Sequence, residues 1–459
     1  MDLKNSSESL VGSDYASRIP RAVWIAVAVY FVALTLLGID RYVIYRSGAD
    51  LGLFVQAIAD GALGMRNQIE GGSHYIYHFS PLLSVVTPIL LLARSPITLI
   101  VVQALAGALT APAIFLLARR RMDERLASMA AVIALLYPPL VGVTFADFHE
   151  NGFAPAAIAW LLWAVDARRF GWAAVFAAGA LAIKEDQAAA LFVLGAGYAV
   201  WSAYRRDKAG AVFGVAVSAT SAAVFVAFFS LVRPLAGAVH AWQPLGFYVA
   251  NHAGEAQGLA AVYFRISFLI EVFAPLLFLP LRSVWVLLAV PGLVEVLTSR
   301  WSITYTMGQH YAGVWIAYVL AAFVCALASV AQKYRARAEL LAKLSIIACA
   351  LILVVASPTH WGHFLGPQTG HGRALNKILA RIPADASVGA VDEVYAHLSL
   401  DPNARAGFTG NLAYLVVDAK YDSETWRKLY QPQLDARLRS ATYDVVANDD
   451  GVTLYRLRQ

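Results

Sequence analysis

Acidic, basic and imidazole side chains gather in a few short polar joints of a chain that is otherwise strongly apolar. These joints contain Asp50, His78, Asp147, His149, Glu150, Lys184, Glu185, Asp186 and His310. Carboxylates and imidazoles exchange protons, and a lysine ammonium neutralises an anion such as a phosphate. A mixed group of Asp, His and Glu can also hold a divalent cation. The joints therefore offer proton transfer, anion binding and metal binding.

The composition places these joints in a membrane protein. Hydrophobic residues make up 59% of the 459 positions and charged residues only 14%, a balance typical of a polytopic membrane protein. The net charge of +6 would favour nucleic-acid binding in a soluble protein. Here the excess cations lie in short joints between apolar runs, where orientation and lipid headgroups explain them. We therefore expect membrane lipids, and no nucleic acid, as partners.

The polar joints sort into two sets when they are assigned alternately to the two membrane faces. One set is rich in arginine and lysine, at 119–121, 168–169, 205–206 and 333–337. The other set carries the acids named above, and all ten histidines of the chain can be placed with it. Short cation-rich joints mark the cytoplasmic face. We therefore expect any chemistry at the outer face of the cytoplasmic (plasma) membrane.

Hydrophobic runs of near-spanning length predict an all-α transmembrane domain over residues 22–357. We expect a cytoplasmic tail at 1–21 and about eleven spans, which place the amino terminus inside and the carboxyl end outside. The expected spans are about 22–39, 96–118, 126–143, 153–166, two short spans within 171–203, 210–232, 263–281, 284–298, 310–331 and 342–357.

A long outer segment, about 40–95, follows the first span. Apolar residues from Leu51 to Met65 recur at helical spacing, which predicts an amphipathic helix along the membrane interface. A second apolar stretch, Leu82–Ala93, contains Pro88 and is too short to span. We expect it to lie in the outer leaflet.

The composition changes again near residue 358. Short β-rich runs at 387–391, 413–417, 443–447 and 452–457 alternate with charged residues, and 423–438 has the pattern of an amphipathic helix. The Asp449-Asp450-Gly451 turn precedes the last run. We therefore predict a small extracytoplasmic α/β domain over 358–459.

This plan resembles that of the GT-C glycosyltransferases, membrane enzymes that take a sugar from a polyprenyl-phosphate carrier. The closest resemblance is to an uncharacterised branch of predicted membrane proteins, a domain of unknown function. The motifs that carry it are Asp50-Leu51-Gly52-Leu53-Phe54, His78-Phe79-Ser80-Pro81, Phe145-Ala146-Asp147-Phe148-His149-Glu150 and Lys184-Glu185-Asp186. The resemblance implies a lipid-linked sugar donor and an envelope glycan, lipid or protein as acceptor.

Asp50 matches the position of the catalytic acid in the first outer loop of that superfamily. A carboxylate there would serve as the general base that takes the proton of an acceptor hydroxyl. A structural interpretation competes, because Ser47-Gly48-Ala49-Asp50 fits a capping box at a helix start. The second acid usual beside the first is absent, since Ala49 and Leu51 flank Asp50. A two-acid metal site at this position is therefore not expected.

The remaining joints have a functional and a structural interpretation each. The resemblance implies that Lys184 holds the donor phosphate, and an internal ion pair in a turn is the alternative. His78, beside Ser80-Pro81, is a candidate for a further contact to the phosphate or a hydroxyl, with a polar interfacial anchor as its alternative. Acceptor binding or a second acid would come from Asp147, His149, Glu150, Glu185, Asp186 and His310, which otherwise form solvated or belt-like loops. No cofactor is indicated with certainty; a divalent cation is possible and its ligands are not defined.

A secondary transporter or flippase is the alternative function. Glu271 and Glu295 fall within predicted spans, and charged residues interrupt the run 171–203; transporters place their sites at such broken helices. The long first outer segment and the outer domain favour the enzyme, and no inverted repeat is visible. A non-catalytic assembly factor on the same scaffold is a third hypothesis.

Overall fold

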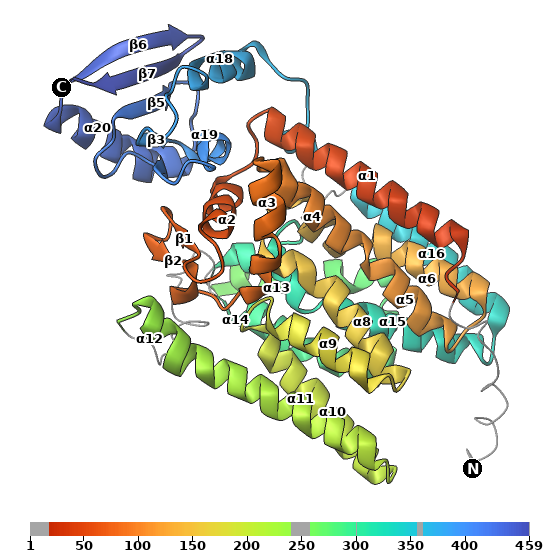
Figure 1. Cartoon of the computed structure of the whole chain (residues 1–459). Coiled ribbons are helices and arrows are strands. Elements are labelled where there is room, and N and C mark those ends of the chain that lie inside the picture. The colour runs from red at the N-terminus through yellow and green to blue at the C-terminus, as the bar shows by residue number, and fades with distance from the viewer. Residues whose placement is uncertain (1–17, 240–257, 300, 356–360, 459) are drawn as a thin grey trace.

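The computed structural model describes residues 18–239, 258–299, 301–355 and 361–458. The joint residue His252 and the predicted domain boundary near 358 lie outside these ranges. Within them the chain forms a helical bundle with a small α/β domain at one end, which we call the tail (Figure 1). Among these described residues, five helices are long and apolar enough to cross a membrane, or six if one bent pair counts as a single span. The predicted number of eleven spans is therefore not established.

The long helices agree in position with predicted spans. They are α1 (Arg21–Val43), α4 and α5 (Ile97–Ala108 and Thr110–Arg119) as one span, α11 (Lys208–Ala227) continuing through α12 (Arg233–Ala236), α13 (Gly258–Phe273) and α16 (Arg335–Val355). The bent pair is α6 (Glu124–Leu136) with α7 (Pro138–Phe145), at 46°. Pro138 and Pro139 begin α7, and proline cannot continue the hydrogen-bonding pattern of the preceding helix.

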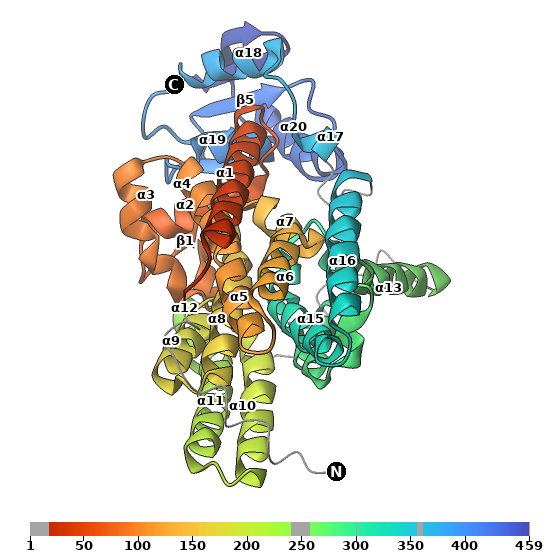
Figure 2. The ribbon, with the colours of Figure 1, turned by 90° about the vertical axis from the view of Figure 1, so that its right-hand side faces the viewer.

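Shorter helices complete the bundle. They are α8 (Ala154–Asp166), α9 (Phe170–Leu181), α10 (Gln187–Tyr204), α14 (Val290–Thr298) and α15 (Ile316–Ala331). Figure 2 shows α10 and α11 projecting from the bundle on the side away from the tail. Helix α15 is buried on almost every face, as expected for a helix that is apolar all round.

The predicted spans 263–281 and 284–298 differ from the structure. The first helix ends by Leu276, and the chain then continues in short 3-10 turns over Leu279–Arg282 and Val284–Ala289 before α14 begins. Pro275 and Pro280 lie in this region and remove backbone donors that a continuous helix needs. Hydrophobicity alone does not reveal such a break.

The first outer segment folds into a compact unit. It comprises α2 (Ala49–Asp60), the strands β1 (Arg66–Asn67) and β2 (Gly72–Ser73), 3-10 turns at His74–Ile76 and Pro81–Val85, and α3 (Thr87–Ala93). Helix α2 ends earlier than the predicted stripe because Gly61 follows with φ 93°, a conformation that glycine adopts without steric cost. Residues 51–58 of α2 are all buried, so this helix is covered by protein rather than lying on an open interface.

The tail contains the strands that the sequence predicts. Its sheet has the order β4-β3-β5-β7-β6, formed by Ala404–Ala406, Val388–Ala390, Tyr414–Asp418, Val452–Leu457 and Tyr443–Asp449. β3 runs parallel to β4 and β5, and β7 runs antiparallel to β5 and β6. The helices α18 (Gly370–Leu379), α19 (Asp392–Leu398) and α20 (Gln431–Ser440) accompany the sheet, and α17 (Trp361–Phe364) precedes it.

The tail docks on α2 through α19 (Figure 1). The side-chain amide of Gln56 donates to the carbonyl oxygens of Asp401 and Ala404, each at 2.9 Å, and its oxygen accepts from the Tyr395 hydroxyl at 2.7 Å. The ring of His397 lies between those of Tyr42 and Tyr45, with 4.0 Å between centroids on both sides. These contacts hold α2 against a domain that is far away in sequence.

We expect Gly52→Ala to loosen this docking. A Cβ atom at position 52 would lie 2.4 Å from Cε1 of Tyr395, and overpacking of this kind typically costs about 1–3 kcal/mol. Hydrogen exchange should become faster in α19 while the spanning helices stay protected. The double variant Gly52→Ala with Tyr395→Ala should recover much of the protection, and Gly171→Ala, where an added Cβ meets nothing within 4 Å, is the control. Unchanged exchange in α19 of Gly52→Ala would contradict the tight contact.

Candidate functional site

The amino-terminal turn of α2 positions Asp50. The residue before the helix is Gly48, and no side chain caps the helix start. The Gly48 N–H instead donates to Asp147 Oδ2 at 2.7 Å. The predicted capping box of Ser47 and Asp50 is therefore wrong, because an acid from a distant joint takes the free backbone donor. Asp50 is left with its carboxylate exposed to a cavity.

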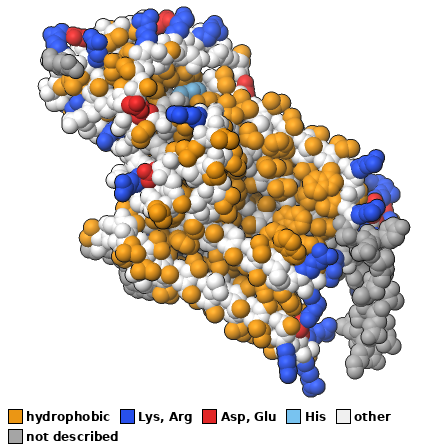
Figure 3. All heavy atoms as spheres, in the orientation of Figure 1, with side chains coloured by type: hydrophobic (Ala, Val, Ile, Leu, Met, Phe, Trp, Pro, Cys, Tyr) orange, Lys and Arg blue, Asp and Glu red, His pale blue; other side chains and the backbone are white. Residues whose placement is uncertain are grey.

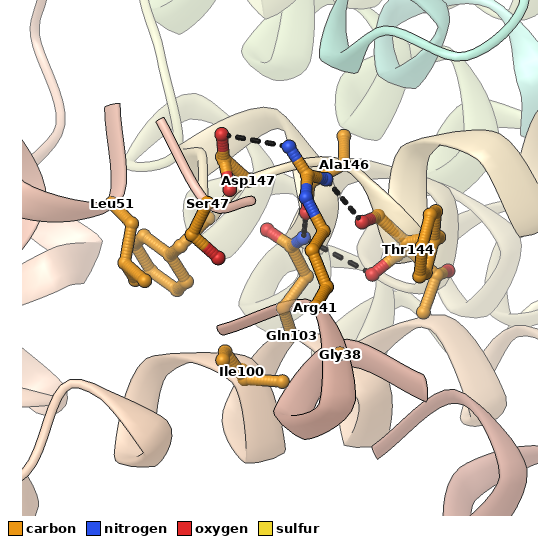
Figure 4. A pocket seen from close by; sticks show the side chains of 11 residues that line it. Gly38, Arg41, Ser47, Leu51, Ile100, Gln103, Thr144, Ala146 and Asp147 are labelled. Atoms are coloured by element: carbon orange, nitrogen blue, oxygen red, sulfur yellow. Dashed lines mark hydrogen bonds and ion pairs between the residues drawn. The ribbon is translucent and has the colours of Figure 1, made fainter. Parts of the chain in front are cut away.

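Arg41 and Gln103 hold the joint that carries Asp147 (Figure 4). The Arg41 guanidinium donates to Asp147 Oδ2 and to the Phe145 carbonyl, each at 2.9 Å. The Gln103 amide donates to the Ala146 carbonyl at 2.9 Å, and its oxygen accepts from the His149 N–H at 2.9 Å. Both ends of the joint 145–149 are thus fixed to the first two spans.

A buried cluster of imidazoles and charges begins at the other end of this joint. The rings of His149 and His310 stack, with 3.4 Å between centroids and 6° between planes. His149 Nδ1 lies 2.8 Å from Glu150 Oε2, and Lys184 Nζ lies 3.7 Å from Glu150 Oε1. Lys184 Nζ is also 3.4 Å from Asp186 Oδ2. The joints 145–150, 184–186 and 310 therefore meet.

The first outer segment contributes further groups to the same region. His78 Nδ1 lies 3.0 Å from Glu185 Oε1, and the Phe79 N–H donates to Glu185 Oε2 at 2.7 Å. His74 Nδ1 contacts Glu70 at 3.0 Å, and its ring lies 5.5 Å from that of His78. The break between α9 and α10 is thus tied to the His78 motif, which the sequence placed on the same face.

A cavity of about 190 Å³ opens between these groups and the tail side of the bundle. Asp50, Asp147 and His310 line it, and the remaining wall is formed by Arg41, Phe145, Ala146, Thr306, Gly308, Gln309 and Phe364. Asp50 reaches the cavity from α2, whereas His310 connects it through His149 and Glu150 to Lys184. Every candidate residue predicted from the sequence therefore belongs to the cavity wall or to the contact network behind it.

The surroundings of Asp50 favour its protonated form. Exclusion of water by the surrounding protein, together with the charges of Asp147, Glu150 and Asp392 and against that of Arg41, raises the pKa of Asp50 to about 7. A carboxyl with a pKa near neutrality can both accept and release a proton under ordinary conditions. Asp50 is therefore electrostatically suited to proton transfer.

Several buried polar atoms of the cluster have no hydrogen-bond partner among the described residues. These atoms are both amide atoms of Asn151, Gln187 Oε1 and His74 Nε2, whereas the oxygens of Glu150 and Asp186 have only the ion-pair contacts given above. Buried polar groups are normally paired, so these atoms offer hydrogen-bonding capacity to water or to a polar ligand. Within the described ranges, no group of three or more His, Cys, Asp or Glu has the arrangement that holds a metal ion.

Sequence reasoning missed three contributors: Arg41, Gln103 and the His74–Glu70 pair. Arg41 could have been recognised, because it is a cation at the predicted outer end of the first span, whereas the cation-rich joints were assigned to the cytoplasmic face. Gln103 is an isolated amide inside a predicted span. The sequence gives no indication of which backbone groups it binds. Of the residues that suggested a transporter, Glu271 is exposed on α13 and Glu295 is partly buried in α14.

Known structures share this arrangement of helices and tail. ArnT from Cupriavidus metallidurans bound to undecaprenyl phosphate aligns with a TM-score of 0.57 and 13% identity, over 95% of this chain and 98% of ArnT. The apo form of the same protein aligns with a TM-score of 0.53 and 15% identity, over 94% of this chain and 97% of ArnT. An oligosaccharyltransferase from Archaeoglobus fulgidus aligns with a TM-score of 0.47 and 15% identity, over 96% of this chain and 74% of the oligosaccharyltransferase. This chain therefore shares the overall fold of the ArnT structures.

A family model extends the comparison to sequence. No curated protein matches this chain. A model described as "Predicted membrane protein (DUF2079)" matches residues 41–454, which include all the joints of the site and most of the tail. The chain belongs to this family of predicted membrane proteins.

Proposed function

We propose that this protein is a membrane glycosyltransferase that moves a sugar from a polyprenyl-phosphate carrier to an acceptor hydroxyl at the outer face of the membrane. The single observation that carries this proposal is the cavity that Asp50 and His310 line together. It puts a carboxyl with a pKa near 7 beside a buried network that contains Lys184. The GT-C fold adds support, since the ArnT structure with this fold was obtained with undecaprenyl phosphate.

In the proposed reaction Asp50 takes the proton of the acceptor hydroxyl. The freed oxygen attacks the anomeric carbon of the sugar, the bond from that carbon to the phosphate oxygen breaks, and the carrier phosphate leaves with the electron pair. Such a single displacement inverts the anomeric configuration. Lys184 and the N–H groups of the histidines, His78 included, would stabilise the charge on the leaving phosphate.

The charges around Lys184 determine which further groups a bound phosphate would require. Glu150, Glu185 and Asp186 surround the single Lys184 cation, so an anionic phosphate requires further N–H donors or positive charge. His74, His78, His149 and His310 can supply N–H groups. A divalent cation would suit the excess of acids, although no group of three or more His, Cys, Asp or Glu among the described residues is arranged to hold one. The acceptor would be an envelope glycan, lipid or protein.

The orientation is part of the proposal. Lysine and arginine side chains gather on the tail and at the opposite end of the bundle, with an apolar surface between them (Figure 3). The joints at that opposite end are the cation-rich set, which favours a cytoplasmic position for them and an outer position for the cavity and the tail. The carrier would then reach the cavity from the outer leaflet of the plasma membrane.

The proposal predicts transfer with a defined pH dependence. Purified protein in proteoliposomes should release undecaprenyl phosphate from synthetic undecaprenyl-phosphate sugars, tested as a panel with crude envelope acceptors. Because the base must be deprotonated, the rate should rise about tenfold per pH unit below 7 and level off above it. Movement of the intact donor between leaflets without bond cleavage would instead favour a flippase. A pH-independent rate between 5 and 8 would rule out Asp50 as the titrating base.

A further inference from the structure

A second cavity lies at the end of the bundle away from Asp50. It is an apolar cleft of about 620 Å³ between α8, α10 and the 3-10 turn Val284–Ala289. Its walls are mainly aliphatic, with Tyr198, Trp201 and Trp285 as the aromatic members. The volume falls within the range of about 300–1,000 Å³ that is usual for small-molecule sites. The proposed glycosyl transfer uses no part of it.

The cleft opens along the lipid-facing side of the bundle. Val284 is 73% exposed, Leu287 57% and Trp201 51%, whereas the inner wall contains the fully buried Leu162 and Val165. An apolar wall that continues into an exposed apolar surface fits hydrocarbon chains better than a water-soluble ligand. The aromatic residues at its mouth have the amphipathic character of a membrane interface.

Arginines surround the mouth of this cleft. The joints 119–121, 166–169 and 205–207 together contain seven arginines and two aspartates. Arg121 pairs with Asp166 and also lies over the Trp285 ring at 5.4 Å. Arg168 pairs with Asp207, and Arg205 lies over Trp201 at 5.7 Å. Arg121 and Arg168 line the cleft beside Asp166, and the other arginines of these three joints give this end of the bundle an excess of positive charge.

We propose that this cleft binds an anionic two-chain phospholipid of the leaflet next to the arginine-rich end. Its acyl chains would fill the apolar cleft, and its phosphate would lie among the arginines at the mouth. Basic pockets between transmembrane helices are known to hold anionic headgroups in this manner. The polyprenyl carrier is a poorer fit, because its phosphate must reach the Asp50 cavity at the other end of the bundle.

Gly197 allows a sharp test. It lines the cleft, and an added Cβ at this position meets nothing within 4 Å, so Gly197→Leu should fill the cleft without displacing protein atoms. Gly179→Leu is the matched control, because position 179 on α9 is equally open and lies outside the cleft. Arg168→Gln removes charge at the mouth and leaves the apolar walls unchanged.

Native mass spectrometry of the full chain can count bound phosphatidylglycerol against phosphatidylcholine. We expect wild type and Gly179→Leu to retain phosphatidylglycerol preferentially, Gly197→Leu to lose this preference, and Arg168→Gln to bind it about fivefold more weakly. Thermal unfolding verifies that every variant is folded. Equal binding of the two lipids by wild type, or undiminished preference in Gly197→Leu, would overturn the proposal. Displacement of phosphatidylglycerol by undecaprenyl phosphate in wild type alone would assign the cleft to the carrier instead. None of these results depends on glycosyl transfer.

Discussion

Asp50→Asn should abolish nearly all transfer while the protein stays folded and still binds undecaprenyl phosphate. The amide keeps the size of the side chain but cannot take the acceptor proton. Loss of a general base typically costs about 10²- to 10⁴-fold in rate. Little structural damage is expected, because the Asp50 side chain is exposed to the cavity and Asp147 rather than Asp50 accepts the Gly48 N–H. The measurement is the release of carrier phosphate, with thermal unfolding alongside.

Asp60→Asn is the matched control for this experiment. Asp60 ends the same helix and accepts a hydrogen bond from the Arg66 N–H at 2.9 Å, so its replacement disturbs α2 without touching the cavity. Near-normal transfer by Asp50→Asn would disprove the catalytic role of Asp50. Loss of transfer in both variants would show that α2 is sensitive to any substitution, and would not identify a base.

Lys184→Met should strongly destabilise the protein. Among the described residues, Lys184 is the one lysine or arginine that pairs with the buried acids Glu150 and Asp186, and removing one member of a buried ion pair typically costs about 3–5 kcal/mol. A simple loss of function in this variant would therefore not separate anion binding from folding. The measurements are the unfolding temperature and the affinity for undecaprenyl phosphate.

The double variant Lys184→Met with Asp186→Asn separates the two roles. It removes one cation and one acid together, so it should recover much of the lost stability. If Lys184 holds the donor phosphate, the double variant should be stable and still fail to bind undecaprenyl phosphate, whereas Lys184→Arg should bind it. Wild-type affinity in the double variant would make Lys184 a structural residue only.

The sequence predicted the participants of the site better than their arrangement. Joints rich in acids and histidines interrupt apolar runs, and burial of charge in a membrane is costly enough that such interruptions mark sites. This reasoning assigned 147–150, 184–186, His78 and His310 to one face, and the structure brings these residues together. It did not reveal that His149 stacks on His310, since that contact joins segments far apart in sequence.

The errors have local physical causes. Hydrophobicity does not distinguish a continuous span from the 3-10 turns over 279–289, where prolines remove helical hydrogen bonds. The capping box at Ser47 was wrong because a distant carboxylate can satisfy a helix start as well as a local one. The tail strands were predictable, since their alternation and turns are local signals. The docking of the tail on α2 was not predictable, because nothing in the sequence around Gln56 and Gly52 indicates that they contact the tail.

The docking of α2 on the tail also sets an order of events during synthesis. Gln56 and its partner Tyr395 are 339 residues apart, and at about 5–20 residues per second the ribosome needs roughly 20–70 s to make the intervening chain. During that interval Tyr42 at the end of α1, Tyr45 in the following connection and Gln56 on α2 lack their partners in the tail. The wall of the Asp50 cavity is made almost entirely before the tail, but α2 acquires its last support only when α19 is made. Assembly of the site therefore ends with the carboxyl-terminal part of the chain, and a nascent or truncated protein would hold Asp50 on a helix that packs on α3 and Phe148 but lacks its contacts with the tail.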